Sequence, residues 1–301
     1  MKKKLNLLFR LLITLTLSAY FFTKIEINTL WNVLKQINPW LFLFSSFLYI
    51  LSSYISTLRW KLFIPSTAKL KTSKLFSLYL IGCFFNIFLP GSMGGDAVKV
   101  LILRRKIGLQ EALSSVFIER YIGFVSLLFL GLLFFLLFFT KIKMHSTLYI
   151  VPASLILFLI GTFILLAIGK FSFLRNAKNY VISLVKKFFF KGFIYSLLVQ
   201  VIVMVSVYII FFGLKLNVAF YEVVIYLPVI IIMATLPISI SGIGVREWGF
   251  IMFFSNSIGN ENAIAVSILW FLSTVFASLI GGVEYLRFKD FLDIKKEYES
   301  L

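Results

Sequence analysis

Eight long apolar segments constrain the fold of this chain more than any other feature. A run of about 20 apolar residues crosses the ~30 Å hydrocarbon core of a bilayer as a helix. Backbone amides in lipid must bond within their own segment, and unbroken runs do not fit the alternating pattern of a membrane barrel. We therefore predict an all-α polytopic membrane protein. The segments are Leu5–Phe22, Trp40–Leu58, Leu75–Leu103, Leu113–Thr140, Leu148–Gly169, Phe193–Gly213, Val223–Phe254 and Ala263–Leu286.

The composition agrees with a membrane protein, since 60% of the residues are hydrophobic and only 14% are charged. The net charge of +18 would suit a nucleic-acid partner. However, the basic residues lie between the apolar segments, where Lys and Arg mark the cytoplasmic side and meet anionic lipid. We therefore expect a membrane lipid and no nucleic acid as partner. The single His145 and single Cys83 argue against a disulfide and a His/Cys metal site, so we expect no metal and no cofactor.

The first apolar segment has two interpretations. Three lysines precede it, and a cut after Ala19 would make it a signal peptide. We prefer an uncleaved first span, because the rest of the chain is itself membranous. Arg10 also lies close enough to the end of the segment to reach the interface.

The third and seventh segments are interrupted by Pro and Gly, at Pro90–Asp96 and Pro237–Glu247. Their long arms have 15 and 14 residues, about 21–22 Å as helices, which is less than the hydrocarbon core. We therefore predict about six spanning helices and two re-entrant broken helices, which form hairpins enclosed by protein or a water-filled cavity. The long arms are Leu75–Leu89 and Val223–Leu236, and arms of seven residues, Ala97–Leu103 and Trp248–Phe254, follow them.

The charges between the segments set the orientation. With a cytoplasmic N-terminus and re-entrant hairpins, 21 of the 30 Lys and Arg residues lie inside, five lie outside and four lie within segments. This excess satisfies the positive-inside rule. We predict a multi-pass protein of the plasma or inner cell membrane with both termini in the cytoplasm, residues 287–301 forming a short tail.

The order span, span, hairpin, span occurs twice, in residues 5–140 and 148–286, with opposite orientations. Many transporters have such inverted-topology repeats, and their substrate sites lie at the repeat interface. Both broken segments also have a long arm, a Pro, a Gly five residues later and an acidic residue. We predict a single membrane domain, residues 1–301, whose two hairpin tips approach each other near the midplane.

The first hairpin has two interpretations. Gly91, Gly94 and Gly95 permit backbone conformations closed to other residues, and Asp96 precedes a short helical arm as an N-cap would. In the first interpretation these residues form only a tight turn and a capped helix start, without a ligand. Alternatively, exposed amides and the helix dipole form an anion site with Lys99, which lies one turn further on. A phospholipid phosphate would suit that site, with Asp96 balancing the charge or binding a coupling cation or proton.

The second hairpin carries charge at membrane depth. Gly242 and Gly244 permit the turn, and Arg246 and Glu247 follow. Buried membrane charges are costly unless they are paired or hydrated, so they indicate function, and Arg binds phosphate with a two-pronged fork. The alternative is a mutual structural salt bridge.

Further polar groups lie near the first hairpin. Glu119 and Arg120 are about six residues into the fourth segment, roughly 9 Å from its end. They either extend to the interface or pair with the first hairpin from the neighbouring span. Asn86 is a further polar group in the first long arm.

At these residues the sequence resembles a known family. Phe85–Val100, Glu119–Arg120 and the run Pro237–Glu247 resemble the flippase-like membrane domain of lysyl-phosphatidylglycerol synthases, and the resemblance covers essentially the whole chain. It implies a domain that moves aminoacylated phosphatidylglycerol between leaflets. In full-length synthases, a separate soluble domain performs the aminoacyl transfer.

Only residues 287–301 follow the last segment, so we expect the translocating half without the synthase, and not an enzyme. The expected function is translocation of an anionic or aminoacylated phospholipid, or of a related polyprenyl-linked lipid. The alternative is a membrane-embedded or accessory protein that presents lipid to a separate transferase for aminoacylation or glycosylation. The expected substrate-binding residues are Asn86, Gly94, Gly95, Asp96, Lys99, Glu119, Arg120, Gly242, Gly244, Arg246 and Glu247, with no catalytic residue. The sequence leaves the oligomeric state open.

Overall fold

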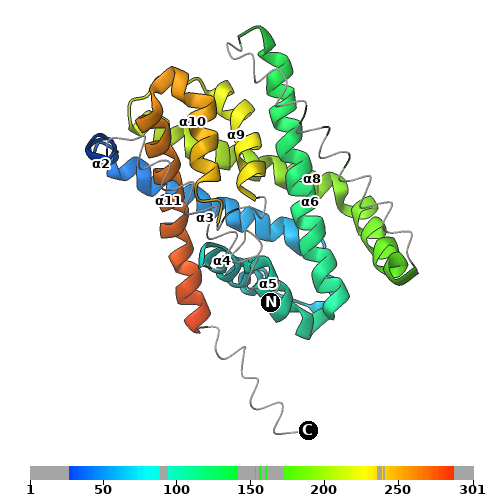
Figure 1. The fold of residues 1–301 in the computed structure, drawn as a ribbon. Helices are drawn as coiled ribbons and strands as arrows, with labels where there is room; N and C mark the ends of the chain where they lie inside the picture. The colour runs from blue at the N-terminus through cyan, green and yellow to red at the C-terminus, as the bar shows by residue number, and fades with distance from the viewer. Residues whose placement is uncertain are drawn as a thin grey trace, which may run out of the picture.

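The computed structural model describes residues 27–88, 94–141, 172–235, 239 and 241–287, together with residues 153, 156 and 160. Within this part the chain is helical and has no strand (Figure 1). The α-helices are α2 (Ile27–Lys35), α3 (Pro39–Lys61), α4 (Thr72–Phe88), α5 (Gly94–Ile107), α6 (Leu109–Leu137), α8 (Ser172–Gly213), α9 (Phe220–Thr235), α10 (Val245–Ile258) and α11 (Asn260–Arg287). Two 3-10 turns, η1 (Ser66–Ala68) and η2 (Phe139–Lys141), complete them.

Four helices are long and apolar enough to cross a membrane, which confirms an all-α polytopic membrane protein. They are Pro39–Lys61, Leu109–Leu137, Val181–Gly213 and Asn260–Arg287. They match four of the six predicted full spans. The other two, Leu5–Phe22 and Leu148–Gly169, lie outside the described residues except for residues 153, 156 and 160. The total number of spans therefore stays a prediction.

Both predicted broken segments consist of two helices that pack against each other, α4 with α5 and α9 with α10. The first arms have 17 and 16 residues, close to the prediction. The prediction of seven-residue second arms is wrong, because α5 and α10 each have 14 residues. Side chains such as Asp96 and Glu247 do not delimit these helices, since they are paired inside the protein.

The helix that contains the sixth apolar segment is also longer than predicted, because it includes the basic region before that segment. Residues 170–191 lie between the fifth and sixth predicted apolar segments, but α8 begins at Ser172 and is continuous over 42 residues. Neither Pro nor Gly occurs between Ser172 and Lys191, so no residue in this stretch breaks the helix. At ~1.5 Å per residue α8 is about 63 Å long, twice the hydrocarbon core.

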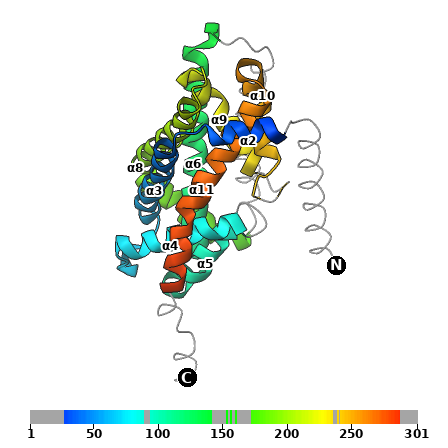
Figure 2. The same cartoon turned by 90° about the vertical axis from the view of Figure 1, so that its left-hand side faces the viewer.

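The helix contacts are reciprocal between the two halves. The span after each hairpin packs against the long arm of the other hairpin, α6 with α9 and α11 with α4. Helices α3 and α8 pack against each other, and exchanging α3–α6 for α8–α11 reproduces the other extensive contacts among these eight helices. The two hairpins lie toward opposite ends of α11 (Figures 1 and 2). Two repeats related by a two-fold axis would give this pattern.

Small residues allow the closest of these contacts. Helix α3 carries buried serines such as Ser45, whose hydroxyl donates to the Ser206 carbonyl of α8. Gly281 lies so close to α4 that a Cβ there would overlap the Leu80 carbonyl. Gly131 of α6 packs less closely, since a Cβ there would lie 3.1 Å from the Pro228 side chain. Small interfacial residues bring membrane helices together in the absence of a hydrophobic driving force between them.

Candidate functional site

The tips of the two hairpins touch. Ser241, in the turn before α10, donates from its hydroxyl to the Ile87 carbonyl at 2.9 Å and to the Asn86 carbonyl at 3.3 Å. The Asn86 side chain in turn accepts a hydrogen bond from the Gly95 amide at 2.8 Å. The predicted approach of the two tips is therefore present, and Asn86 links both arms of the first hairpin to the second.

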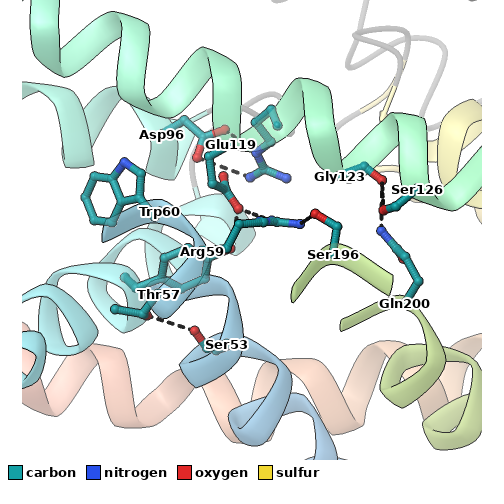
Figure 3. A network of polar contacts seen from close by, with 12 residues as sticks. Ser53, Thr57, Arg59, Trp60, Asp96, Glu119, Gly123, Ser126, Ser196 and Gln200 are labelled. Carbon is teal, nitrogen blue, oxygen red and sulfur yellow. Dashed lines mark hydrogen bonds and ion pairs between the residues drawn. The ribbon is translucent and has the colours of Figure 1, made fainter. Parts of the chain in front are cut away.

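A buried ion-pair network lies beside the first hairpin (Figure 3). Asp96 accepts hydrogen bonds from Arg120 at 2.7 Å (Nε) and 3.2 Å (Nη2), and Lys99 Nζ lies 2.8 Å from the same carboxylate. Lys99 Nζ is also 4.0 Å from Glu119. Glu119 pairs with Arg59, whose Nη1 donates to Ser196 Oγ at 2.8 Å. Four helices, α3, α5, α6 and α8, therefore share one network.

The network contains three cationic side chains and two carboxylates, so it carries one excess positive charge. Its members differ sharply in exposure. The side chains of Lys99 and Glu119 are 2% and 1% exposed, whereas that of Arg120 is 39% exposed. Arg120 is therefore the member best placed to meet a ligand. Of the predicted choices for Glu119 and Arg120, the structure shows pairing with the first hairpin.

Lys99 is enclosed rather than presented to a ligand. Its ammonium lies 4.5 Å from the centre of the Tyr79 ring and 5.1 Å from that of Trp60, an arrangement that stabilises a cation. The Trp60 indole donates to Ser115 Oγ at 3.1 Å, which fixes the ring. We expected Lys99 to contribute to an exposed anion site, but its contacts hold Asp96 in place from inside the protein.

Sequence reasoning missed Arg59. It directly follows the second apolar segment, so we counted it with the basic residues of the cytoplasmic loop. The helix continues to Lys61, and Arg59 is buried together with Ser52 and Ser56. These three residues are spaced i, i+4 and i+7 and so share one helix face. The polar helix face formed by Ser52, Ser56 and Arg59 continues past the end of the apolar segment, and this pattern could have indicated that Arg59 is buried.

The glycines of the two hairpins have different roles. Gly94 and Gly95 lie in helix α5, and a Cβ on Gly95 would overlap the Gly82 carbonyl, so close packing requires glycine there. The prediction of special backbone conformations is wrong for this pair. It is confirmed for Gly242 and Gly244, which have φ of +75° and +85°. Gly91 lies outside the described residues.

The prediction that Asp96 precedes its helix as an N-cap is also wrong. Helix α5 begins at Gly94, so Asp96 lies in its first turn. A carboxylate there still interacts favourably with the helix dipole. Its side chain is turned toward Lys99 and Arg120, which compensate its burial.

Arg246 and Glu247 form a second, closed cluster. Glu247 Oε1 accepts from Arg246 Nη2 at 2.6 Å and from Ser267 Oγ at 2.9 Å, while Oε2 accepts from the Gly244 amide at 2.6 Å. The guanidinium lies over the Phe271 ring, 4.5 Å from its centre. This geometry agrees with the structural salt bridge, and the contacts of the pair with Ser267 and Phe271 connect α10 to α11.

The two clusters occupy corresponding places in the two halves. The start of α5 faces Glu119 and Arg120 on α6, and the start of α10 faces Trp270 and Phe271 at the same offset on α11. Charged partners in the first half are thus replaced by aromatic partners in the second. Among the described residues, the ion pairs of the two clusters share no member, although the hairpin tips touch.

The comparison with known families identifies the chain over most of its length. The family model described as the lysylphosphatidylglycerol synthase TM region matches residues 7–282. This match confirms the resemblance seen in the hairpin motifs. No curated protein matches the chain.

Proposed function

We propose, on the premise that this chain belongs to the lysylphosphatidylglycerol synthase TM region family, that it translocates a lipid between leaflets. The lipid is an anionic or aminoacylated phospholipid, or a related polyprenyl-linked lipid. In this proposal the chain lies in the cell membrane with both termini in the cytoplasm and performs no covalent chemistry. Its two halves are inverted repeats, as the reciprocal helix contacts support.

One observation carries the proposal: the network beside the first hairpin has an excess positive charge, and only Arg120 among its members is substantially exposed. Asp96 holds Arg120 through Nε and Nη2, which orients the guanidinium without occupying Nη1. An oriented guanidinium is well suited to a lipid phosphate. The headgroup would pass Arg120 while the acyl chains stay in the bilayer.

The shared carboxylate of Asp96 gives the network a way to accept and release an anion. When a phosphate binds Arg120, Asp96 keeps its partner Lys99, so no carboxylate is left buried and unpaired. When the phosphate leaves, Arg120 returns fully to Asp96. For an aminoacylated lipid, the same carboxylate would attract the ammonium of the headgroup.

In this proposal, the conformation in which the hairpin tips touch is the closed state of the lipid pathway. Ser241 ties the second hairpin to the end of α4 through two hydrogen bonds, next to the network. Separation of the tips would break these bonds and few others between described residues of the two tips. In this proposal, alternating movement of the two repeats opens the polar path first to one leaflet and then to the other.

Leaflet exchange in liposomes tests the proposal. The purified protein should equilibrate a fluorescent phosphatidylglycerol between leaflets without changing it chemically, and Arg120→Gln should slow exchange by at least about tenfold, the equivalent of one charge-assisted hydrogen bond. Arg104→Gln is the matched control, because Arg104 is exposed on α5 outside the network. Equal exchange by the Arg120 variant would refute the site.

The alternative function, presentation of lipid to a separate transferase, predicts a different result in the same experiment. A protein that only presents lipid to a transferase would bind the lipid but leave its leaflet distribution unchanged. Chemical alteration of the lipid by the protein alone would instead indicate a membrane-embedded enzyme.

A further inference from the structure

A basic groove of about 1250 Å³ lies apart from the ion-pair network. Its walls come from the end of α3, the loop around η1, the start of α4, the end of α5, the start of α6 and the middle of α8. Three basic regions distant in sequence therefore meet at one groove. Among the described residues that line it, the charged ones are Lys61, Lys69, Lys106, Lys187 and Lys191 and a single carboxylate, Glu111.

One face of α8 combines apolar and cationic side chains. Leu184, Lys187, Phe188, Lys191 and Tyr195 all line the groove, and their spacing places them on one side of the helix. The Lys187 ammonium lies 5.2 Å from the centre of the Phe188 ring. Lysines of this kind lay their stems along apolar surface and direct their charge to a polar interface.

We propose that this groove binds an anionic phospholipid, with the phosphate on the lysines and the upper acyl chains against the apolar face of α8. The charge of the groove is complementary to a phosphate, and its volume exceeds the ~300–1,000 Å³ of a small-molecule site. The α8 wall belongs to the apolar span Val181–Gly213, where lipid chains are the neighbouring medium. An acidic protein segment would complement the positive charge of the groove, but it would not suit the apolar wall that belongs to the span.

The groove is separate from the proposed translocation site. None of Arg59, Asp96 or Arg120 lines it. Trp60 and Leu103 are 0% and 2% exposed, and with Leu75 they form a core between α3, α4 and α5 that closes this side of the network. The inference therefore does not rest on translocation.

Lipid retention by the purified full-length chain tests this site. The protein in mild detergent is incubated with phosphatidylglycerol, phosphatidylcholine or glycerol phosphate, and bound molecules are counted by native mass spectrometry at low salt. We expect one phosphatidylglycerol to be retained, phosphatidylcholine to be lost, and glycerol phosphate not to compete. Each lysine near an anionic headgroup contributes about fivefold in binding, so Lys187→Gln with Lys191→Gln should weaken retention roughly 25-fold.

Three variants make the result specific. Arg104→Gln with Arg105→Gln removes two exposed charges outside the groove and should leave retention unchanged. Lys187→Arg with Lys191→Arg keeps the charge and should retain the lipid, which shows that loss in the Gln variant is not misfolding. Arg120→Gln should lose no more than a lipid bound at the proposed translocation site and should keep the groove lipid, because Arg120 does not line the groove.

Several outcomes would overturn the assignment. Equal retention of phosphatidylcholine, or unchanged retention by the Lys187→Gln, Lys191→Gln variant, would show that these lysines select no anionic lipid. Competition by glycerol phosphate at equal concentration would assign the groove to a soluble anion. Absence of any retained lipid from the unmodified chain would leave an acidic protein segment as the occupant.

Discussion

The hydroxyl of Ser241 donates a hydrogen bond to the carbonyl oxygen of Ile87 at 2.9 Å, although 154 positions separate them in the sequence. Ile87 is in the last turn of α4, whose final carbonyls have no partner within the helix. Ser241 has a φ of +52°, a conformation that costs an L-residue about 1–2 kcal/mol. A strained serine of one half therefore caps a helix of the other.

Removing this hydroxyl should weaken the contact between the halves. We expect Ser241→Ala to destabilise the protein by about 1–2 kcal/mol, because the α4 carbonyls lose their donor while the backbone strain remains. Thermal unfolding in detergent measures this. Ser239→Ala is the matched control, since the buried Ser239 hydroxyl has no hydrogen-bond partner among the described residues and its removal should be neutral or stabilising. Equal effects of the two substitutions would contradict this role of Ser241.

The Arg59–Glu119 pair should show strong energetic coupling. Replacing Glu119 by Gln leaves the Arg59 guanidinium buried without its carboxylate, which we expect to cost about 3–5 kcal/mol. The double variant Arg59→Met, Glu119→Gln should recover much of that loss. A double-mutant cycle of unfolding free energies measures the coupling.

The exposed pair Glu284–Arg287 serves as the comparison. Its atoms lie 3.8 Å apart and the Arg287 side chain is 75% exposed, so Glu284→Gln should cost no more than about 1 kcal/mol. Similar losses for Glu119→Gln and Glu284→Gln would mean that the buried network does not hold α3 and α6 together.

Gly95 should tolerate no side chain. The Cβ of Gly95→Ala would overlap the Gly82 carbonyl, and backbone cannot move aside as a side chain can. We expect α5 to separate from α4, with loss of more than about 3 kcal/mol or failure to accumulate in the membrane. Expression and thermal unfolding report this directly.

Gly249 occupies a comparable place in the second hairpin, where α10 packs on α9. A Cβ there meets the Ile230 side chain at 3.1 Å, and that side chain can adjust. Gly249→Ala should therefore cost only about 1–3 kcal/mol. A Gly95→Ala protein as stable as Gly249→Ala would show that the approach of α5 to α4 is not required.

The orientation of the first hairpin can be measured with introduced cysteines. We expect Arg105→Cys to react only from the cytoplasm and Lys215→Cys only from outside. The orientation that puts most Lys and Arg residues in the cytoplasm places position 105 inside and position 215 outside. Impermeant thiol labelling of intact cells and inverted vesicles distinguishes the two sides. The natural Cys83 is buried and should stay silent. Labelling of position 105 from outside would rule out a re-entrant first hairpin.

Much of the architecture could be predicted because helix formation in a membrane depends on local properties. Apolar length, backbone satisfaction and the Pro/Gly interruptions placed four spans and both helix breaks. The lengths of α5 and α10 could not be predicted this way, because charged residues within them looked like helix ends. Asp96 and Arg246 are compatible with a helix at this depth because their charges are paired. Asp96 is paired with Lys99 and with Arg120 of α6. Arg246 is paired with its neighbour Glu247 and donates to Ser267 of α11.

For the candidate site, too, some features could be predicted from the sequence and others required the tertiary structure. The sequence alone identified the residues that bring charge to membrane depth, with the exception of Arg59, since charge in an apolar run is visible without a structure. The sequence left the Arg246–Glu247 salt bridge as one of two alternatives, and the structure shows it. Only the tertiary structure decided the other pairings: Arg59 joins Glu119, and Lys99 is enclosed by rings. Burial and pairing depend on contacts between helices far apart in sequence, which the composition of a single segment does not record. That is why Arg120, and not Lys99 or Arg246, was left partly open to a ligand.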